Sequence, residues 1–96
     1  FFDDLERSQS DSLWAMERRG GETVDDLLDW AEDRDPSVPT FAWLHLYDAH
    51  FPYSPPAAYL EKWKSNPYDG ELAYVDDLMA RVTEVFDPAN TLFVVV

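Results

Sequence analysis

The chain has 96 residues, of which 20 are acidic and 7 are basic, so its formal net charge is −13 at neutral pH. Nucleic acids and anionic membranes are bound through clustered lysines and arginines, so this balance argues against both partners. Aromatic residues make up 16% of the chain, which is too many for a disordered acidic segment. We therefore expect a folded domain with a strongly acidic surface, of the kind used by proteins that work at high salt.

The chain contains no cysteine, which excludes disulfides, thiolate metal ligands and a cysteine nucleophile within it. The lack of cysteine leaves the compartment open, and a cytoplasmic location is slightly favoured. No segment approaches the roughly 18 apolar residues that span a bilayer. Because the chain starts at Phe1 and stops in the apolar run TLFVVV, we interpret it as a piece of a larger protein, truncated at both ends.

Residues 1–22 have no regular apolar pattern, and we interpret them as an irregular acidic lead-in that ends in the break RRGG. A domain over residues 23–96 follows. It begins with a predicted helix over residues 23–34, because Thr23 is a suitable N-cap and the apolar residues behind it share one helix face: Val24, Leu27, Leu28 and Ala31. Asp35-Pro36 ends this helix, since proline disfavours the helical conformation in the residue before it.

A buried strand is predicted over residues 40–47, which read TFAWLHLY. The segment is apolar almost throughout, which is typical of a strand covered on both faces in a parallel sheet. The next residues, FPYSPP, contain too many prolines for a sheet interior and indicate a turn. A short helix over residues 57–64 follows, with a proline at its first turn.

The longest predicted helix spans residues 69–86, where apolar residues repeat with the 3.6-residue helical period: Leu72, Val75, Leu78, Met79, Val82 and Phe86. After a turn at DPAN, a second buried strand is predicted over residues 91–96. Two strands joined by a connection that contains helices make a βαβ crossover. We therefore expect an α/β fold, as a fragment of a parallel or mixed sheet flanked by helices.

Three segments, taken in order, carry a resemblance to a known family: FAWLHLYDAHFPYSPPAAYLEKW from Phe41, NPYDGELAYVDDLMARV from Asn66, and NTLFVVV from Asn90. Together they resemble the middle of a sulfatase of the alkaline-phosphatase superfamily. Members of that family show an apolar strand that leads into Asp-Pro-His-x-Pro-Tyr, then a helix with Tyr-x-Gly-Glu, then an Asn/Asp-Thr strand. The resemblance covers residues 41–96 well and residues 23–34 loosely, and it implies an alkaline-phosphatase-like fold.

The resemblance also implies a substrate-binding residue. His50 matches the family histidine that donates a hydrogen bond to an oxygen of the sulfate or phosphate ester, a role that suits imidazole because it can be charged near neutral pH. Asp48 could support it by a hydrogen bond to the ring or to the backbone of the turn. Between the two, the family has a proline and this chain has Ala49.

The rest of the chemistry is expected outside this chain. The family nucleophile is a formylglycine made from Cys or Ser in a Cys/Ser-x-Pro/Ala-x-Arg motif, which does not occur here. The family's divalent cation, usually calcium, is held by acids near the N-terminus and by an Asp-Asn or Asp-His pair beyond the strand that matches TLFVVV. We therefore expect no catalytic residue and no metal ligand in this chain. Alone it would be an inactive fragment of a sulfuric ester hydrolase acting on a small-molecule ester.

Other interpretations stay open. The parent protein could be a phosphoesterase or phosphotransferase of the same superfamily, or the chain could be a non-catalytic acidic α/β interaction module. Without the resemblance, His50 is more simply a turn histidine bonded to backbone. Asp48 and His50 are too few ligands for zinc or calcium. The acids of the long helix are interpreted as a solvated face: Asp69, Glu71, Asp76 and Asp77.

Overall fold

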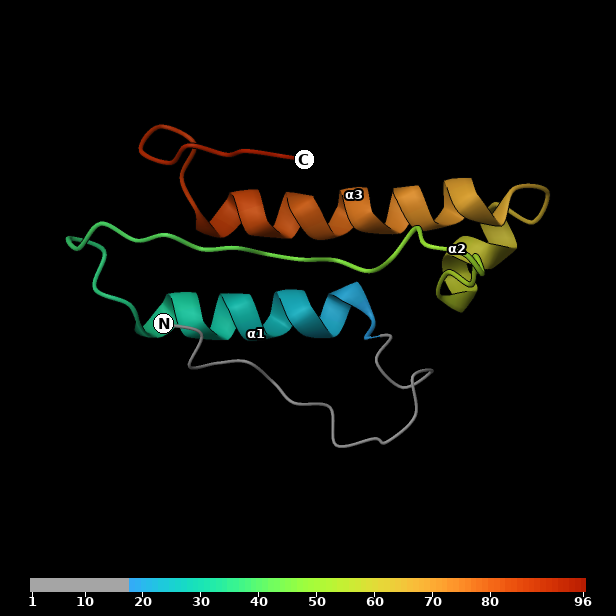
Figure 1. Cartoon of the computed structure of the whole chain (residues 1–96), viewed down its shortest axis with the longest axis horizontal. Helices are drawn as coiled ribbons and strands as arrows, with labels where there is room; N and C mark the ends of the chain where they lie inside the picture. Colours follow the sequence, from blue (N-terminus) through green and yellow to red (C-terminus); the bar gives the residue numbers. More distant parts are fainter. Residues whose placement is uncertain (1–17) are drawn as a thin grey trace.

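The computed structural model describes residues 18–96, and this part of the chain consists of three helices and long irregular connections. α1 spans Gly20–Asp33, α2 spans Ala57–Lys62 and α3 spans Pro67–Val85. α1 and α3 pack together and run in the same direction, and the short α2 packs on α3 (Figure 1). Residues 1–17 of the predicted lead-in lie outside the described residues.

α1 begins three residues before its predicted start. Thr23 is not the N-cap, because the Arg19 carbonyl oxygen already accepts hydrogen bonds from the N–H groups of Glu22 (3.1 Å) and Thr23 (3.4 Å). The N–H of Gly21 donates instead to the Tyr74 hydroxyl of α3 at 2.8 Å. A contact with another helix thus satisfies a first-turn donor that a helix cannot satisfy within itself. The boundary expected after residue 22 falls inside α1.

The other two helices are confirmed near their predicted bounds. α2 ends at Lys62, and α3 begins at Pro67, two residues before its predicted start. Proline is well suited to this first helical position, because its missing N–H would have no intrahelical partner there. No helix within residues 18–96 has both the length and the apolar character that a bilayer span requires.

The hydrophobic core lies where α1 meets α3. Val24 of α1 is fully buried and packs with other buried residues of the two helices or their ends: Ala31, Leu78, Val82 and Phe86. These residues belong to the two predicted apolar stripes. The stripe of α1 is confirmed as core-facing, and the C-terminal half of the long-helix stripe is confirmed in part, since Val75 and Met79 are only partly buried. Leu72 is an exception in its stripe, since 43% of it is exposed. Each fully buried aliphatic or aromatic side chain contributes about 1.5–3 kcal/mol.

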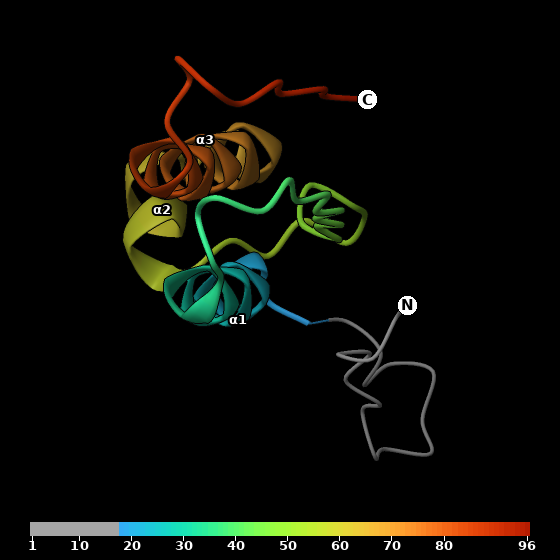
Figure 2. The ribbon, with the colours of Figure 1, turned by 90° about the vertical axis from the view of Figure 1, so that its left-hand side faces the viewer.

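The predicted parallel sheet is wrong for the described part of the chain. Residues 40–47 and 91–96 are extended, but neither is hydrogen-bonded into a ladder, so residues 18–96 contain no β-strand. A strand needs the backbone of a neighbour. Residues 40–47 instead run alongside α1 and α3 (Figures 1 and 2), and Leu44, Leu46 and Phe93 pack on the core of the helices. The expected α/β class, βαβ crossover and alkaline-phosphatase-like architecture give way to a helical fold flanked by extended segments.

The predicted burial of both faces of residues 40–47 is also wrong. Leu44 and Leu46 pack on the core, whereas Phe41 and Trp43 are 83% and 73% exposed. Successive side chains of an extended chain point to opposite sides, so the helices cover one face of the segment and leave the other uncovered. The C-terminal segment alternates in the same way at its start, where Thr91 and Phe93 are half-buried and Leu92 and Val94 are exposed. The apolar run therefore does not mean that every residue in it is buried, since only one of its two faces packs on the core.

Candidate functional site

Residues 48–54 form the turn that follows the first extended segment, and this turn carries both predicted site residues. Ala49 has a φ of 67°, in the left-handed region that residues other than glycine rarely adopt. Proline cannot adopt it, because its ring holds φ near −65°. The family proline therefore does not fit this turn backbone, and Ala49 is a larger departure from the sulfatase pattern than the sequence indicated.

Glu71 of α3 holds both ends of the turn. One carboxylate oxygen accepts a hydrogen bond from the Ala49 N–H, and the other accepts one from the Ser54 N–H at 2.8 Å. Glu71 is only 5% exposed, and a carboxylate removed from water requires such partners. The interpretation of Glu71 as a solvated acid is therefore wrong, although Asp76 and Asp77 are exposed as expected.

The sequence did contain a signal for Glu71. It lies three residues before Tyr74 and seven before Leu78, and residues at these spacings share one helix face. Leu78 is buried, so the same periodicity that identified the apolar stripe also placed a carboxylate on it. Acidic residues are almost never fully buried without partners, so this position called for N–H donors from another segment.

His50 is exposed, and two contacts of its Nδ1 orient the ring. Nδ1 lies 2.7 Å from the Phe51 carbonyl oxygen and 3.0 Å from the Tyr47 hydroxyl oxygen. A carbonyl oxygen can only accept, so Nδ1 carries the proton. The Tyr47 ring also stacks on the imidazole, with centroids 4.6 Å apart. The backbone contact expected of a simple turn histidine is thus present, and Nε2 is the ring nitrogen able to bind an external partner.

The Asp48 carboxylate lies against the start of α1. Its Oδ2 is buried and has no hydrogen-bond partner among the described residues. Gly20, the first residue of α1, lies directly against it, since a Cβ added to Gly20 would be 2.5 Å from Oδ2. The carboxylate therefore lies at the positive end of the α1 dipole, while Nδ1 of His50 has Tyr47 and Phe51 as partners. Support of the His50 ring by Asp48 stays a prediction.

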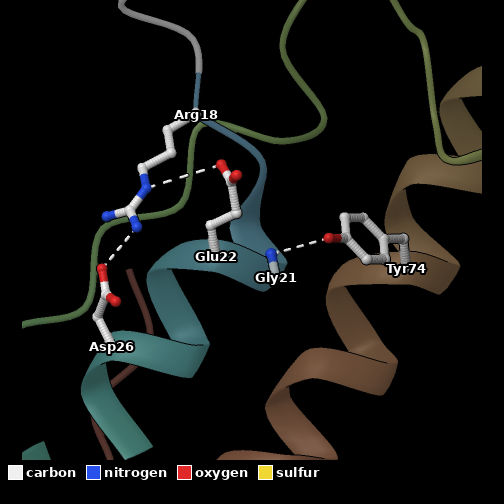
Figure 3. Close-up of polar contacts among 5 residues, drawn as sticks. All are labelled: Arg18, Gly21, Glu22, Asp26 and Tyr74. Atoms are coloured by element: carbon white, nitrogen blue, oxygen red, sulfur yellow. Dashed lines mark hydrogen bonds and ion pairs between the residues drawn. The ribbon is translucent and has the colours of Figure 1, made fainter. Parts of the chain in front are cut away.

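Two arginines lie on the other side of the turn. Arg18 forms ion pairs with Asp26 (2.6 Å) and Glu22 (3.7 Å) of α1 (Figure 3). Arg19 donates a hydrogen bond from Nη1 to the Ser54 carbonyl oxygen at 2.7 Å. Sequence reasoning treated these arginines only as part of a break. Their position next to each other was a usable signal, because two consecutive basic residues are unusual in a chain with only seven basic residues and a net charge of −13.

An open cavity of about 170 Å³ lies between the turn, the start of α1 and Glu71 of α3. Its lining residues are Arg18, Arg19, Tyr47, Asp48, His50, Pro52, Ser54 and Glu71. A single water needs only about 10–15 Å³ of such volume, so a small ion has room. Guanidinium groups bring five N–H donors each and bind oxyanions bidentately. In the lining, the two arginines balance the carboxylates of Asp48 and Glu71, so the cavity is less acidic than the chain as a whole, whose net charge is −13.

Within residues 18–96, no group of three or more His, Cys, Asp or Glu side chains is placed to hold a metal ion. The divalent cation implied by the sulfatase resemblance stays a prediction about the parent protein.

Comparisons of the chain with protein-family models, with curated proteins and with solved structures find no match. The sulfatase resemblance therefore rests on the three sequence segments alone. Among the residues it singled out, His50 and Asp48 both line the cavity.

Proposed function

We propose that this chain is part of a sulfatase-like hydrolase and that its cavity contacts the anionic group of a sulfate ester. The observation that carries the proposal is the presence of His50, Arg18 and Arg19 in the lining of one cavity, at the turn that resembles the family's substrate-contacting segment. The two arginines carry N–H donors in either case, whereas Nε2 of His50 accepts in the neutral ring and becomes a donor only when the ring is protonated.

In this proposal the chain supplies electrostatic stabilisation and not the bond-breaking groups. A donor aimed at an ester oxygen stabilises the negative charge that develops there as the ester is cleaved. The nucleophile and the divalent cation belong to parts of the parent protein outside this chain. The 96-residue chain alone is therefore expected to bind a tetrahedral oxyanion without hydrolysing an ester.

The test is the affinity of the full chain for inorganic sulfate, measured by titration calorimetry at constant ionic strength. Ionic strength must be fixed because the net charge of −13 repels anions through a field whose screening length is about 8 Å at physiological salt. His50→Gln and Arg19→Gln are each expected to weaken binding about tenfold or more, since a hydrogen bond to a charged group contributes about 1.5–3 kcal/mol.

Matched controls come from the same chain. His45→Gln and Arg81→Gln change the same residue types outside the cavity lining, and both are expected to leave sulfate affinity unchanged. Equal losses of sulfate affinity in His45→Gln and His50→Gln would contradict the proposal, as would the absence of sulfate binding by the unaltered chain. Phosphate bound about tenfold more tightly than sulfate would favour the phosphoesterase alternative, because both anions are tetrahedral but differ in charge.

The gene provides an independent test. The coding sequence before the chain should contain a Cys/Ser-x-Pro/Ala-x-Arg motif, and the sequence directly after Val96 should contain Asp-His or Asp-Asn. The absence of both would refute membership of a sulfatase-like enzyme, whatever the cavity binds.

A further inference from the structure

The turn that presents His50 has little backbone support of its own. Outside the helices, none of the backbone–backbone hydrogen bonds formed by the described residues involves residues 48–54. Residues 50–54 are exposed, so water can satisfy their backbone groups, but water does not fix one conformation of the segment. The conformation of this turn therefore depends on side chains that reach it from the helices.

We infer that Glu71 is the positioning residue of the cavity, whose buried carboxylate fixes the turn that presents His50. The biological meaning of this inference rests on the proposed function. The N–H groups that Glu71 accepts belong to Ala49 and Ser54, so they flank His50 on both sides. Through them a helix holds the two ends of a turn that forms no backbone–backbone hydrogen bond to other described residues.

A carboxylate is the side chain that this geometry requires. Ionised glutamate has two acceptor oxygens and no donor, whereas glutamine would turn an NH₂ group toward one of the two N–H donors. Hydrogen bonds to an ionised acceptor are roughly twice as strong as neutral ones. The main chain of Ser54 is held on its other side as well, since its carbonyl oxygen accepts from Arg19. One turn residue thus joins Glu71 to an arginine of the cavity.

The neighbouring residue of α3 allows the approach. A Cβ added to Gly70 would lie 3.1 Å from Pro55 Cγ and 3.3 Å from Trp63 Cβ. Pro55 is buried and directly follows the turn. The start of α3 therefore sits in van der Waals contact with the end of the turn, and the short reach of Glu71 to Ser54 follows from this packing.

Glu71→Gln in the full chain tests the inference, with Glu84→Gln as the matched control at an exposed position of the same helix. The readout is the NMR spectrum of the His50 ring, whose signals the stacked Tyr47 ring should displace from free-imidazole positions. In Glu71→Gln we expect these signals to move toward free-imidazole positions and sulfate affinity to fall about tenfold. The His45 signals and the helical circular dichroism should remain, and Glu84→Gln should alter none of these readouts.

Unchanged His50 signals in a folded Glu71→Gln chain would overturn the inference. If that variant does not fold, hydrogen exchange in the unaltered chain decides. The amides of Ala49 and Ser54 should exchange at least about tenfold more slowly than an unstructured peptide, and exchange at the unstructured rate would overturn the inference. A chain that fails to bind sulfate removes the proposed function but leaves the His50 and amide readouts intact, so the two ideas fail separately.

Discussion

The α1–α3 pair and the extended segments contain similar apolar residues that differ in how far they are exposed to solvent. Leu78 in α3 is 4% exposed, whereas Leu92 in the C-terminal segment is 89% exposed. A helix satisfies its own backbone and needs only a side-chain partner, while an extended segment also needs a neighbouring backbone. Helical periodicity therefore identifies the buried face of α1 and of the second half of α3, whereas the apolar composition of residues 40–47 and 91–96 does not show which of their residues are buried.

The largest expected effect comes from truncating the two leucines. Leu78→Ala should destabilise the chain by about 2–5 kcal/mol, because it leaves a cavity between α1 and α3. Leu92→Ala should change stability by less than about 0.5 kcal/mol, because the side chain is already in water. Urea denaturation followed by circular dichroism measures both. Similar losses for the two variants would show that the C-terminal segment is packed as tightly as the helices.

A second substitution tests how closely α1 approaches the turn. Gly20→Ala would place a methyl group 2.5 Å from Asp48 Oδ2 and 2.8 Å from Leu78 Cδ1, and such overpacking costs about 1–3 kcal/mol. Helix propensity alone predicts the opposite sign, since alanine is favoured over glycine by about 1 kcal/mol. The thermal midpoint should therefore fall in Gly20→Ala, and the added change Asp48→Ala should recover part of the loss. A higher midpoint in Gly20→Ala would contradict the packing.

A third substitution removes one contact between the helices. Tyr74→Phe deletes the hydroxyl that accepts the Gly21 N–H and should cost about 0.5–1.5 kcal/mol. Tyr68→Phe, at an exposed position of the same helix, serves as the control and should be close to neutral in the same denaturation assay. Equal effects would mean that the Gly21 contact contributes nothing to the pairing of α1 with α3.

The smallest expected effect is a pH dependence at the surface between α2 and α3. Tyr59 donates its hydroxyl proton to Asp77 at 2.6 Å, and this hydrogen bond raises the pKa of Tyr59 above its ordinary value. A raised folded-state pKa means that the stabilisation is complete below the ordinary tyrosine pKa of about 10 and is lost as the pH rises through the higher folded value. NMR titration should give a lower Tyr59 pKa in Asp77→Asn, with Asp76→Asn unchanged. A Tyr59 pKa that does not move in Asp77→Asn would rule out this contact.

The helices could be predicted because their signals are local. The spacing of Val24, Leu27, Leu28 and Ala31, and the stripe that contains Leu78 and Val82, both report on one chain segment at a time. The extended segments could not be predicted in the same way. Whether Phe41 and Trp43 are covered depends on another element packing on their face of the segment, which no local pattern reveals, and no described residue covers them fully.

The candidate site likewise contains residues that could be predicted from a local pattern and residues that could not. His50 and Asp48 were identifiable from the sequence because they lie together in a recognisable turn motif. Glu71, Arg18 and Arg19 reach the turn from other elements, so only their unusual placement hinted at them: an acid on an apolar stripe and two adjacent cations in an acidic chain. Ala49 has a left-handed conformation and a hydrogen bond from its N–H to Glu71 of another element, and its residue type gave no indication of either.

The claim that this cavity binds an oxyanion is tested most directly by an NMR titration of the unaltered chain with sulfate at constant ionic strength. The chain has two histidines, so each titration contains its own reference. We predict a saturable displacement of the His50 ring signals, while those of His45 stay in place. Parallel displacement of both rings, or none of either, would contradict it.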